Sequence, residues 1–190
     1  CIGKRGERRP MQGIVFQVLE ACYVDAFGPD EWLEVVDAAG TPDNFTYSAD
    51  YADADLGKLV ASIAEAQDLT PVQVLRWFGE HAIPHFHDFA PDLFDCYRAC
   101  WPFLRSLNDI IHPQVRQRYP GADVPDFEYP DATGDAQIIT YRSPRRMCAF
   151  AEGLMLGAAA HFGEQLAIVQ SRCMHQGDDH CRFELRFATA

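Results

Sequence analysis

Apolar residues recur every three or four positions along most of the first 111 residues, which is the spacing of amphipathic helices. Thr70 followed by Pro71 marks one helix start, because a threonine hydroxyl caps free backbone amides and proline fits the first helical position. The predicted helices cover residues 13–27, 29–39, 56–66, about 71–80 and, interrupted by Pro102, 92–111. The first part of the chain is therefore expected to be helical.

The pattern changes after residues 119–121, where short segments rich in β-branched and aromatic residues begin. These segments predict strands, and a stretch rich in small residues between them predicts one more helix. The expected elements are strands 126–129 and 137–141, a helix over 144–163, and a hairpin of strands 166–173 and 181–187 that turns around Gly177 and Asp178. Helices followed by antiparallel strands indicate an α+β domain.

The composition of the 190 residues limits the classes of function that the chain can have. Hydrophobic residues make up 48%, enough for one sizeable core and a large ligand inside it. A formal net charge of −12 disfavours nucleic acid and an anionic membrane surface as partners, since both require clustered positive charge. No apolar run is long enough to cross a bilayer. We expect a single domain, with residues 1–10 as an extension ahead of a natural start at Met11.

His112 is the first candidate for chemistry. On a helical wheel it points in nearly the same direction as Trp101, Asn108 and Val115, from a partly apolar face. Pro113 disfavours helical geometry at the residue before it, which predicts a kink or a new helix start at the histidine. A lone histidine on such a face is more often a core residue than a ligand, so this pattern leaves both interpretations open.

Tyr141, Ser143 and Arg145 form the second candidate group. In an extended segment, residues at alternate positions project to the same side, so a phenol, a hydroxyl and a guanidinium would face one target. Such donors suit an anion, either a carboxylate or a phosphate. The alternative is an ordinary strand end with surface contacts.

The cysteines form the third group. Seven cysteines at irregular spacing argue against a secreted disulfide framework and for thiols or a metal site in a cytoplasmic protein. A three-residue loop at residues 176–178 would place Cys173, His175 and Cys181 on one sheet face and His180 on the other. Together with Cys148 they would make a tetrahedral zinc site with His175, or His180 as the alternative, as fourth ligand. Two reduced cysteines beside a turn are the alternative interpretation.

The motifs taken together resemble those of a known family. They are MQGIVFQVLE, FGEHAIPHF, DIIHPQV, YPGADVP, YRSPR and FAEGLMLGAAAHF. The chain resembles the H-NOX (haem-nitric oxide/oxygen binding) family, related to the haem domain of soluble guanylate cyclase, from residue 11 to residue 187. The resemblance implies an H-NOX fold with haem b buried between a distal helical subdomain, about 11–70, and a proximal subdomain, about 71–187.

The resemblance also implies roles for individual residues. His112 matches the ligand of the haem iron, and Tyr141, Ser143 and Arg145 match the clamp on the haem propionates. Three further positions match residues that pack on the porphyrin, namely Pro125, Val15 and Phe86.

Phe150 matches the position of a distal tyrosine that donates a hydrogen bond to oxygen in oxygen-holding relatives. Bound oxygen gains much from such a donor and nitric oxide gains little, so the resemblance implies a sensor that binds nitric oxide at ferrous iron and excludes oxygen. Nitric oxide would weaken the bond from iron to His112, and the two subdomains would shift. The implied partner is a signalling protein such as a histidine kinase or a cyclic-di-GMP enzyme.

Alternatives to this interpretation remain open. A subset of bacterial H-NOX proteins resembles this chain in carrying zinc on cysteines that match Cys148, Cys173 and Cys181. The histidine of that subset, three residues before the second cysteine, is Gln170 here. This departure leaves the fourth zinc ligand open. A zinc and cysteine redox sensor on the same fold, with haem secondary, is the alternative function. An enzyme using haem is disfavoured, because the sequence offers no convincing acid and base pair, and we expect a non-enzymatic sensor.

Overall fold

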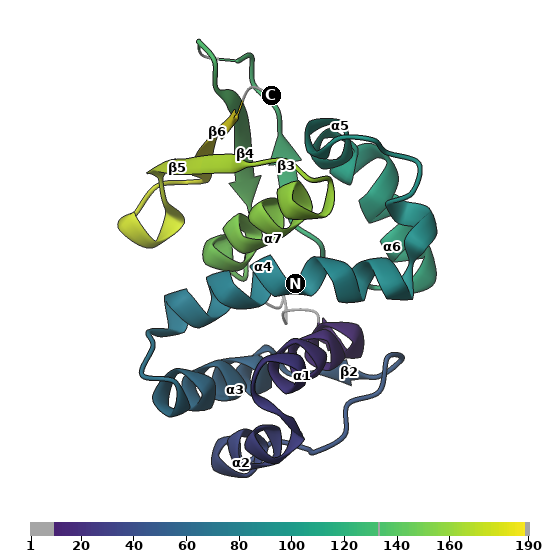
Figure 1. Cartoon of the computed structure of the whole chain (residues 1–190), viewed down its shortest axis with the longest axis vertical. Coiled ribbons are helices and arrows are strands. Elements are labelled where there is room, and N and C mark those ends of the chain that lie inside the picture. Colours follow the sequence, from purple (N-terminus) through teal and green to yellow (C-terminus); the bar gives the residue numbers. More distant parts are fainter. Residues whose placement is uncertain (1–9, 133, 189–190) are drawn as a thin grey trace, which may run out of the picture.

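The computed structural model describes residues 10–132 and 134–188. Figure 1 shows three layers, with α1–α3 on one side, α4 in the middle, and α7 with a four-stranded sheet on the other side. The elements are β1 (Met11–Gln12), α1 (Gly13–Phe27), α2 (Pro29–Ala39), β2 (Asp50–Tyr51), α3 (Asp53–Ala66), α4 (Pro71–Phe89), the 3₁₀ turn η1 (Pro91–Leu93), α5 (Cys100–Arg105), the π-helix η2 (Leu107–Ile111), α6 (His112–Arg118), β3 (Asp126–Glu128), β4 (Gln137–Arg142), α7 (Cys148–His161), β5 (Leu166–Arg172), the 3₁₀ turn η3 (Met174–Gln176) and β6 (Cys181–Phe187). The predicted α+β class is confirmed.

The first hydrophobic core, which we call the N-terminal core, lies between α1, α2, α3 and the first half of α4. Its largest fully buried side chains include Phe16, Tyr23 and Phe78. Phe16 stacks on Phe45 from the loop before β2, with 4.7 Å between ring centroids. This loop therefore closes the end of the core near the short β1–β2 ladder.

The second core, which we call the C-terminal core, lies between the sheet, α5, α7 and the second half of α4. The sheet is antiparallel in the order β3-β4-β6-β5. Its register places Phe127 and Cys181 on either side of Tyr141, because β4 pairs with both β3 and β6. Side chains from the start of β6 and the end of β4 consequently lie next to one another.

Helices α4 and α7 cross at glycines, which let the two backbones approach closely. A Cβ atom added at Gly153 would overlap the main-chain oxygen of Arg76 and come within 2.8 Å of the Glu80 nitrogen. One added at Gly79 would overlap the main-chain oxygen of Phe150. The close crossing therefore fixes α7, and with it Phe150, against α4.

Most predicted elements are present, but several ends differ. Helix α3 begins at Asp53 and not at residue 56, and α7 covers Cys148–His161 and not 144–163. The helix expected to end near residue 80 continues through Pro84 to Phe89, because Ala82 and Ile83 on its buried face keep packing into the two cores. The capping of that helix is as predicted, and Gln73 completes it by bonding back to the Thr70 amide at 2.8 Å. The stretch 92–111 is not one helix but α5 and η2 preceded by a turn.

The hairpin turn also differs from the prediction. Residues 173–180 form a longer connection that contains η3, and Gly177 adopts a left-handed conformation with φ of 99°. The predicted three-residue loop is wrong. None of the described helices is long and apolar enough to span a membrane.

Candidate functional site

His112 stands at a break in the helical path. The π-helix η2 ends at Ile111 and α6 begins at His112, with Pro113 as its second residue. This matches the predicted helix start at the histidine. Asn108 ties η2 to the sheet, because its side-chain amide donates to the Phe127 carbonyl and its oxygen accepts from the Phe127 amide at 3.2 Å. π-Helical turns often lie at functional sites because they redirect one side chain.

The His112 imidazole is buried and neutral. The residue is 8% exposed, and its ring lies 5.7 Å from the Phe127 ring between centroids. Burial, with the positive charge of Arg116, lowers the pKa of His112 from 6.5 to about 4. Its Nδ1 atom has no hydrogen-bond partner among the described residues. A satisfied core histidine would not leave a buried nitrogen unpaired, whereas a neutral imidazole with an available nitrogen is the form that binds a metal.

Tyr141 provides a protonated phenol whose ring, like the His112 imidazole, lies beside Phe127. It is buried at the end of β4, and its ring lies 5.6 Å from that of Phe127, the residue that also contacts His112. Burial raises the pKa of Tyr141 to about 12, although a hydrogen bond with Ser143 opposes the shift. The phenol therefore keeps its proton at neutral pH and can donate to an anion.

Ser143 and Arg145 follow β4 in a turn and are not on the strand itself. The turn is closed by a bond from the Arg146 amide to the Ser143 carbonyl at 3.1 Å, and Arg146 adopts a positive φ of 53°. The Ser143 hydroxyl oxygen accepts from the Arg145 amide at 3.2 Å. Predicting an extended segment here was wrong beyond Arg142, but the turn still brings the three side chains of the motif to one region.

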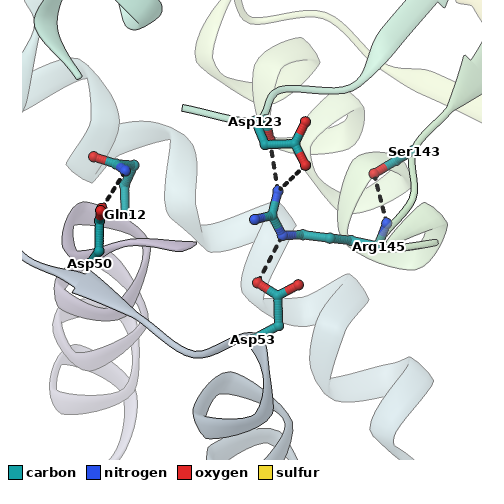
Figure 2. A network of polar contacts seen from close by, with 6 residues as sticks. All are labelled: Gln12, Asp50, Asp53, Asp123, Ser143 and Arg145. Atoms are coloured by element: carbon teal, nitrogen blue, oxygen red, sulfur yellow. Dashed lines mark hydrogen bonds and ion pairs between the residues drawn. The ribbon is translucent and has the colours of Figure 1, made fainter. Parts of the chain in front are cut away.

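The Arg145 guanidinium binds carboxylates, as its chemistry predicts (Figure 2). Its Nε atom donates to Asp53 Oδ1 at 2.9 Å, and its Nη1 atom donates to Asp123 Oδ2 at 3.1 Å and to the Asp123 carbonyl at 2.9 Å. The sequence reasoning missed both aspartates. Asp53 lies 92 residues from Arg145, and nothing in the local pattern around an N-terminal helix residue indicates such a partner.

Of the apolar residues predicted to pack on a porphyrin, Phe86 lies at the boundary between the two cores. Phe86 on α4 packs against both cores, and Val15 on α1 packs against the N-terminal core. Phe150 on α7 also packs against that core, and its ring stacks on Phe78 with 4.6 Å between centroids. Pro125 is half-buried in the segment before β3.

Three thiols form a separate cluster, and one of them belongs to Cys181, which pairs with Tyr141 across β4 and β6. The Sγ atoms of Cys148, Cys173 and Cys181 all lie within 4.8 Å of one another, and those of Cys148 and Cys173 are 3.9 Å apart. Cys148 begins α7, Cys173 follows β5 and Cys181 begins β6. Burial raises the pKa of Cys181 to about 12, so a metal bound there would have to displace thiol protons.

The structure does not bring either predicted histidine into the thiol cluster. His175 is exposed, and its Nε2 atom lies 2.7 Å from the Arg146 carbonyl. His180 lies beside Asp179, with 2.6 Å between Nδ1 and Oδ1. The longer turn explains the difference, because η3 takes His175 out of the strand pattern on which the prediction depended. Gln170 instead lies beside Cys148 at the cluster.

Comparisons with known proteins agree with these features. The profile of the family described as Haem-NO-binding matches residues 12–170. The chain belongs to the Haem-NO-binding family. This H-NOX domain is a member of a family of haem-based gas sensors, as the motifs predicted. No curated protein gives a significant match.

Solved structures show the same fold for this H-NOX domain. An H-NOX protein from S. oneidensis in the Fe(II)NO state is 28% identical, with a TM-score of 0.87 over 94% of this chain and 100% of that chain. The NMR structure of the SO2144 H-NOX domain from Shewanella oneidensis in the Fe(II)CO state is 28% identical, with a TM-score of 0.85 over 95% and 100%. The Fe(II) unliganded H-NOX protein from K. algicida, 23% identical, has a TM-score of 0.82 over 95% and 98%.

The residues present fit a haem. His112 offers a buried neutral imidazole with an unpaired nitrogen, and Arg145 already binds carboxylates, the chemical group of a propionate. Phe86, at the boundary of the cores, adds flat apolar surface. This chain therefore carries the donor set that the cofactor of its family requires.

Proposed function

We propose that this chain is a sensor that binds nitric oxide at the ferrous iron of haem b, excludes oxygen and signals to a partner protein. The observation that carries the proposal is the His112 imidazole, which is buried, neutral and unpaired at Nδ1. A buried polar atom without a partner costs free energy unless a ligand uses it. Coordination of haem iron by the His112 imidazole would account for a buried imidazole with an unpaired nitrogen.

In this proposal the side chains hold the cofactor by complementary chemistry. Bound haem supplies an iron that coordinates diatomic gases, which no side chain offers. His112 binds the iron, while the Tyr141 phenol, the Ser143 hydroxyl and the Arg145 guanidinium bind the propionates. The cation of Arg145 matters most, because a carboxylate in a partly buried site needs a compensating charge. Val15, Phe86 and Pro125 pack on the ring.

Phe150 is proposed to select the gas. Its side chain has no hydrogen-bond donor, and its ring is held against Phe78. Oxygen on ferrous iron carries partial negative charge and gains much from a donor, whereas nitric oxide gains little. A phenylalanine at this position therefore favours nitric oxide over oxygen.

A tyrosine at position 150 is expected to change this preference. The reduced wild-type protein should change its absorption spectrum with nitric oxide and form no stable oxygen complex in air. Phe150→Tyr should hold oxygen, with affinity raised about tenfold or more, since one hydrogen bond to a charged group contributes about 1.5–3 kcal/mol. Phe78→Tyr, at the stacked ring, is the control. A stable oxygen complex of the wild type would contradict the role of Phe150.

The proposal includes a cellular location and a signalling partner. We place the protein in the cytoplasm as a non-enzymatic module, and six described cysteines are free thiols, which supports a reducing compartment. A histidine kinase or a cyclic-di-GMP enzyme would receive the signal. Co-purification of such an enzyme, with its activity changed by nitric oxide only when this protein is present, tests that step.

The thiol cluster supports a second signal, in addition to the binding of nitric oxide at the haem. Three Sγ atoms within 4.8 Å of one another match the thiolate ligands of a structural zinc site, and we propose that the cluster binds zinc. Oxidation of the thiols would release the metal, which gives the chain a redox input beside the haem input.

Zinc content provides the test of this second input. Cys173→Ser is expected to lower bound zinc from about one per chain to below a tenth of that, because only two of the three clustered thiols would remain as ligands. Cys96→Ser is the matched control, since Cys96 is exposed and lies outside the cluster. Elemental analysis of both purified variants measures the bound zinc per chain. Unchanged zinc in Cys173→Ser would count against the site.

A further inference from the structure

Arg145 joins three segments that are far apart in the sequence (Figure 2). Asp53 is the first residue of α3 and belongs to the N-terminal part of the chain, whereas Asp123 lies between α6 and β3. Their contacts with the guanidinium are 2.9–3.1 Å long, and the Arg145 side chain is only 10% exposed. We call this set the Arg145 bridge. It holds α3 to the segment that follows the His112 helix.

The charge of the bridge is not balanced. One guanidinium faces the carboxylates of Asp53 and Asp123, so the group carries a net charge of −1. The second oxygen of Asp53 is buried and has no hydrogen-bond partner among the described residues. Three contacts to these aspartates already occupy donors of the guanidinium, which has five in all. A further carboxylate arriving at Arg145 would meet two like charges in a partly buried setting, where screening by water is weak.

We propose that Asp53 and Asp123 compete with the haem propionates for Arg145, so that haem loading loosens the tie between α3 and the segment before β3. This inference rests on the proposed haem function. Because coupling between two equilibria is reciprocal, a stronger bridge weakens haem retention and bound haem weakens the bridge. The two aspartates therefore set how firmly haem is kept and whether the two parts of the chain are tied together.

If the aspartates only ordered Arg145, removing one of them would speed haem loss and not slow it. If Asp53 only held the guanidinium in place for a propionate, its removal would disorder Arg145 and haem would leave faster. In the proposed competition, repulsion between Asp53 and a propionate outweighs the ordering that Asp53 gives to Arg145, because Asp123 still holds the guanidinium through two contacts. The sign of the change in haem loss therefore separates the two roles.

Haem dissociation from Asp53→Asn tests the competition. Haem loss is followed by transfer to excess apomyoglobin, and Asp53→Asn is expected to lose haem about five- to tenfold more slowly than wild type. Asp55→Asn is the matched control, because it removes a carboxylate from the same helical turn, where Asp55 binds the exposed Lys58 at 2.8 Å. In the haem-free protein, Asp53→Asn should lower the urea midpoint, since the bridge is weakened.

A modified ligand makes the test specific to propionates. With haem dimethyl ester, which has no propionate charge, the advantage of Asp53→Asn should disappear. Equal or faster haem loss from Asp53→Asn, or an advantage that persists with the ester, would overturn the competition. If the wild type takes up no haem, the proposed function fails and the competition fails with it. Failure of the haem function can be told apart from failure of the competition alone, because the absorption spectrum of the wild type would then show no bound haem.

Discussion

His112→Gly is expected to retain less than about a tenth of the wild-type haem after purification, because the iron loses its protein ligand. The imidazole is the group that places a neutral, buried nitrogen at the start of α6. Free imidazole at millimolar concentration should enter the space left by the side chain and restore the Soret band. Absorbance at the Soret maximum relative to protein absorbance measures both effects.

The folded state should survive this substitution. The His112 Nδ1 atom has no partner among the described residues, so removing the ring breaks no hydrogen bond there. His85→Ala is the control, since His85 on α4 contacts Asp25 on α1 at 3.4 Å, and this variant should keep its haem. Haem retention by His112→Gly without imidazole, with an unchanged spectrum, would remove His112 as the ligand.

Much of the fold could be predicted because local signals agreed with packing. The capping pair at the start of α4 and the positions of β4, β5 and β6 are examples. The missed extension of α4 has a tertiary cause, which is that distant contacts overrode a local signal. Pro84 disfavours a helix on local grounds, yet the neighbouring Ala82 and Ile83 are buried in the cores and the helix continues.

The candidate site was predictable in its residue types but not in its partners. The unpaired nitrogen of His112 follows from burial between η2, α6 and β3, which no local pattern encodes. Asp53 and Asp123 reach Arg145 only through the tertiary fold. Predicting His175 as a zinc ligand assumed a short turn, and the actual connection through η3 places its ring against Arg146 instead.

Gly153→Ala is expected to lower the free energy of unfolding by about 3 kcal/mol, because the added methyl group has no space between α4 and α7. It would overlap the Arg76 carbonyl oxygen and lie 2.9 Å from the Gly79 Cα atom. These are backbone atoms, so no side chain can rotate away and the helices must separate. Urea unfolding of the haem-free protein measures the loss through its midpoint at constant slope.

Gly57→Ala provides a matched control for this substitution. Gly57 is also in the middle of a helix, but an added Cβ atom meets nothing within 4 Å, so alanine should stabilise the protein by up to about 1 kcal/mol. Opposite signs for the two glycines would show that the crossing, and not helix propensity, requires Gly153. Equal effects would contradict it. Because Gly79 faces the Phe150 backbone at the same crossing, Gly153→Ala should also alter nitric oxide binding in the haem-loaded protein by displacing the residue proposed to select the gas.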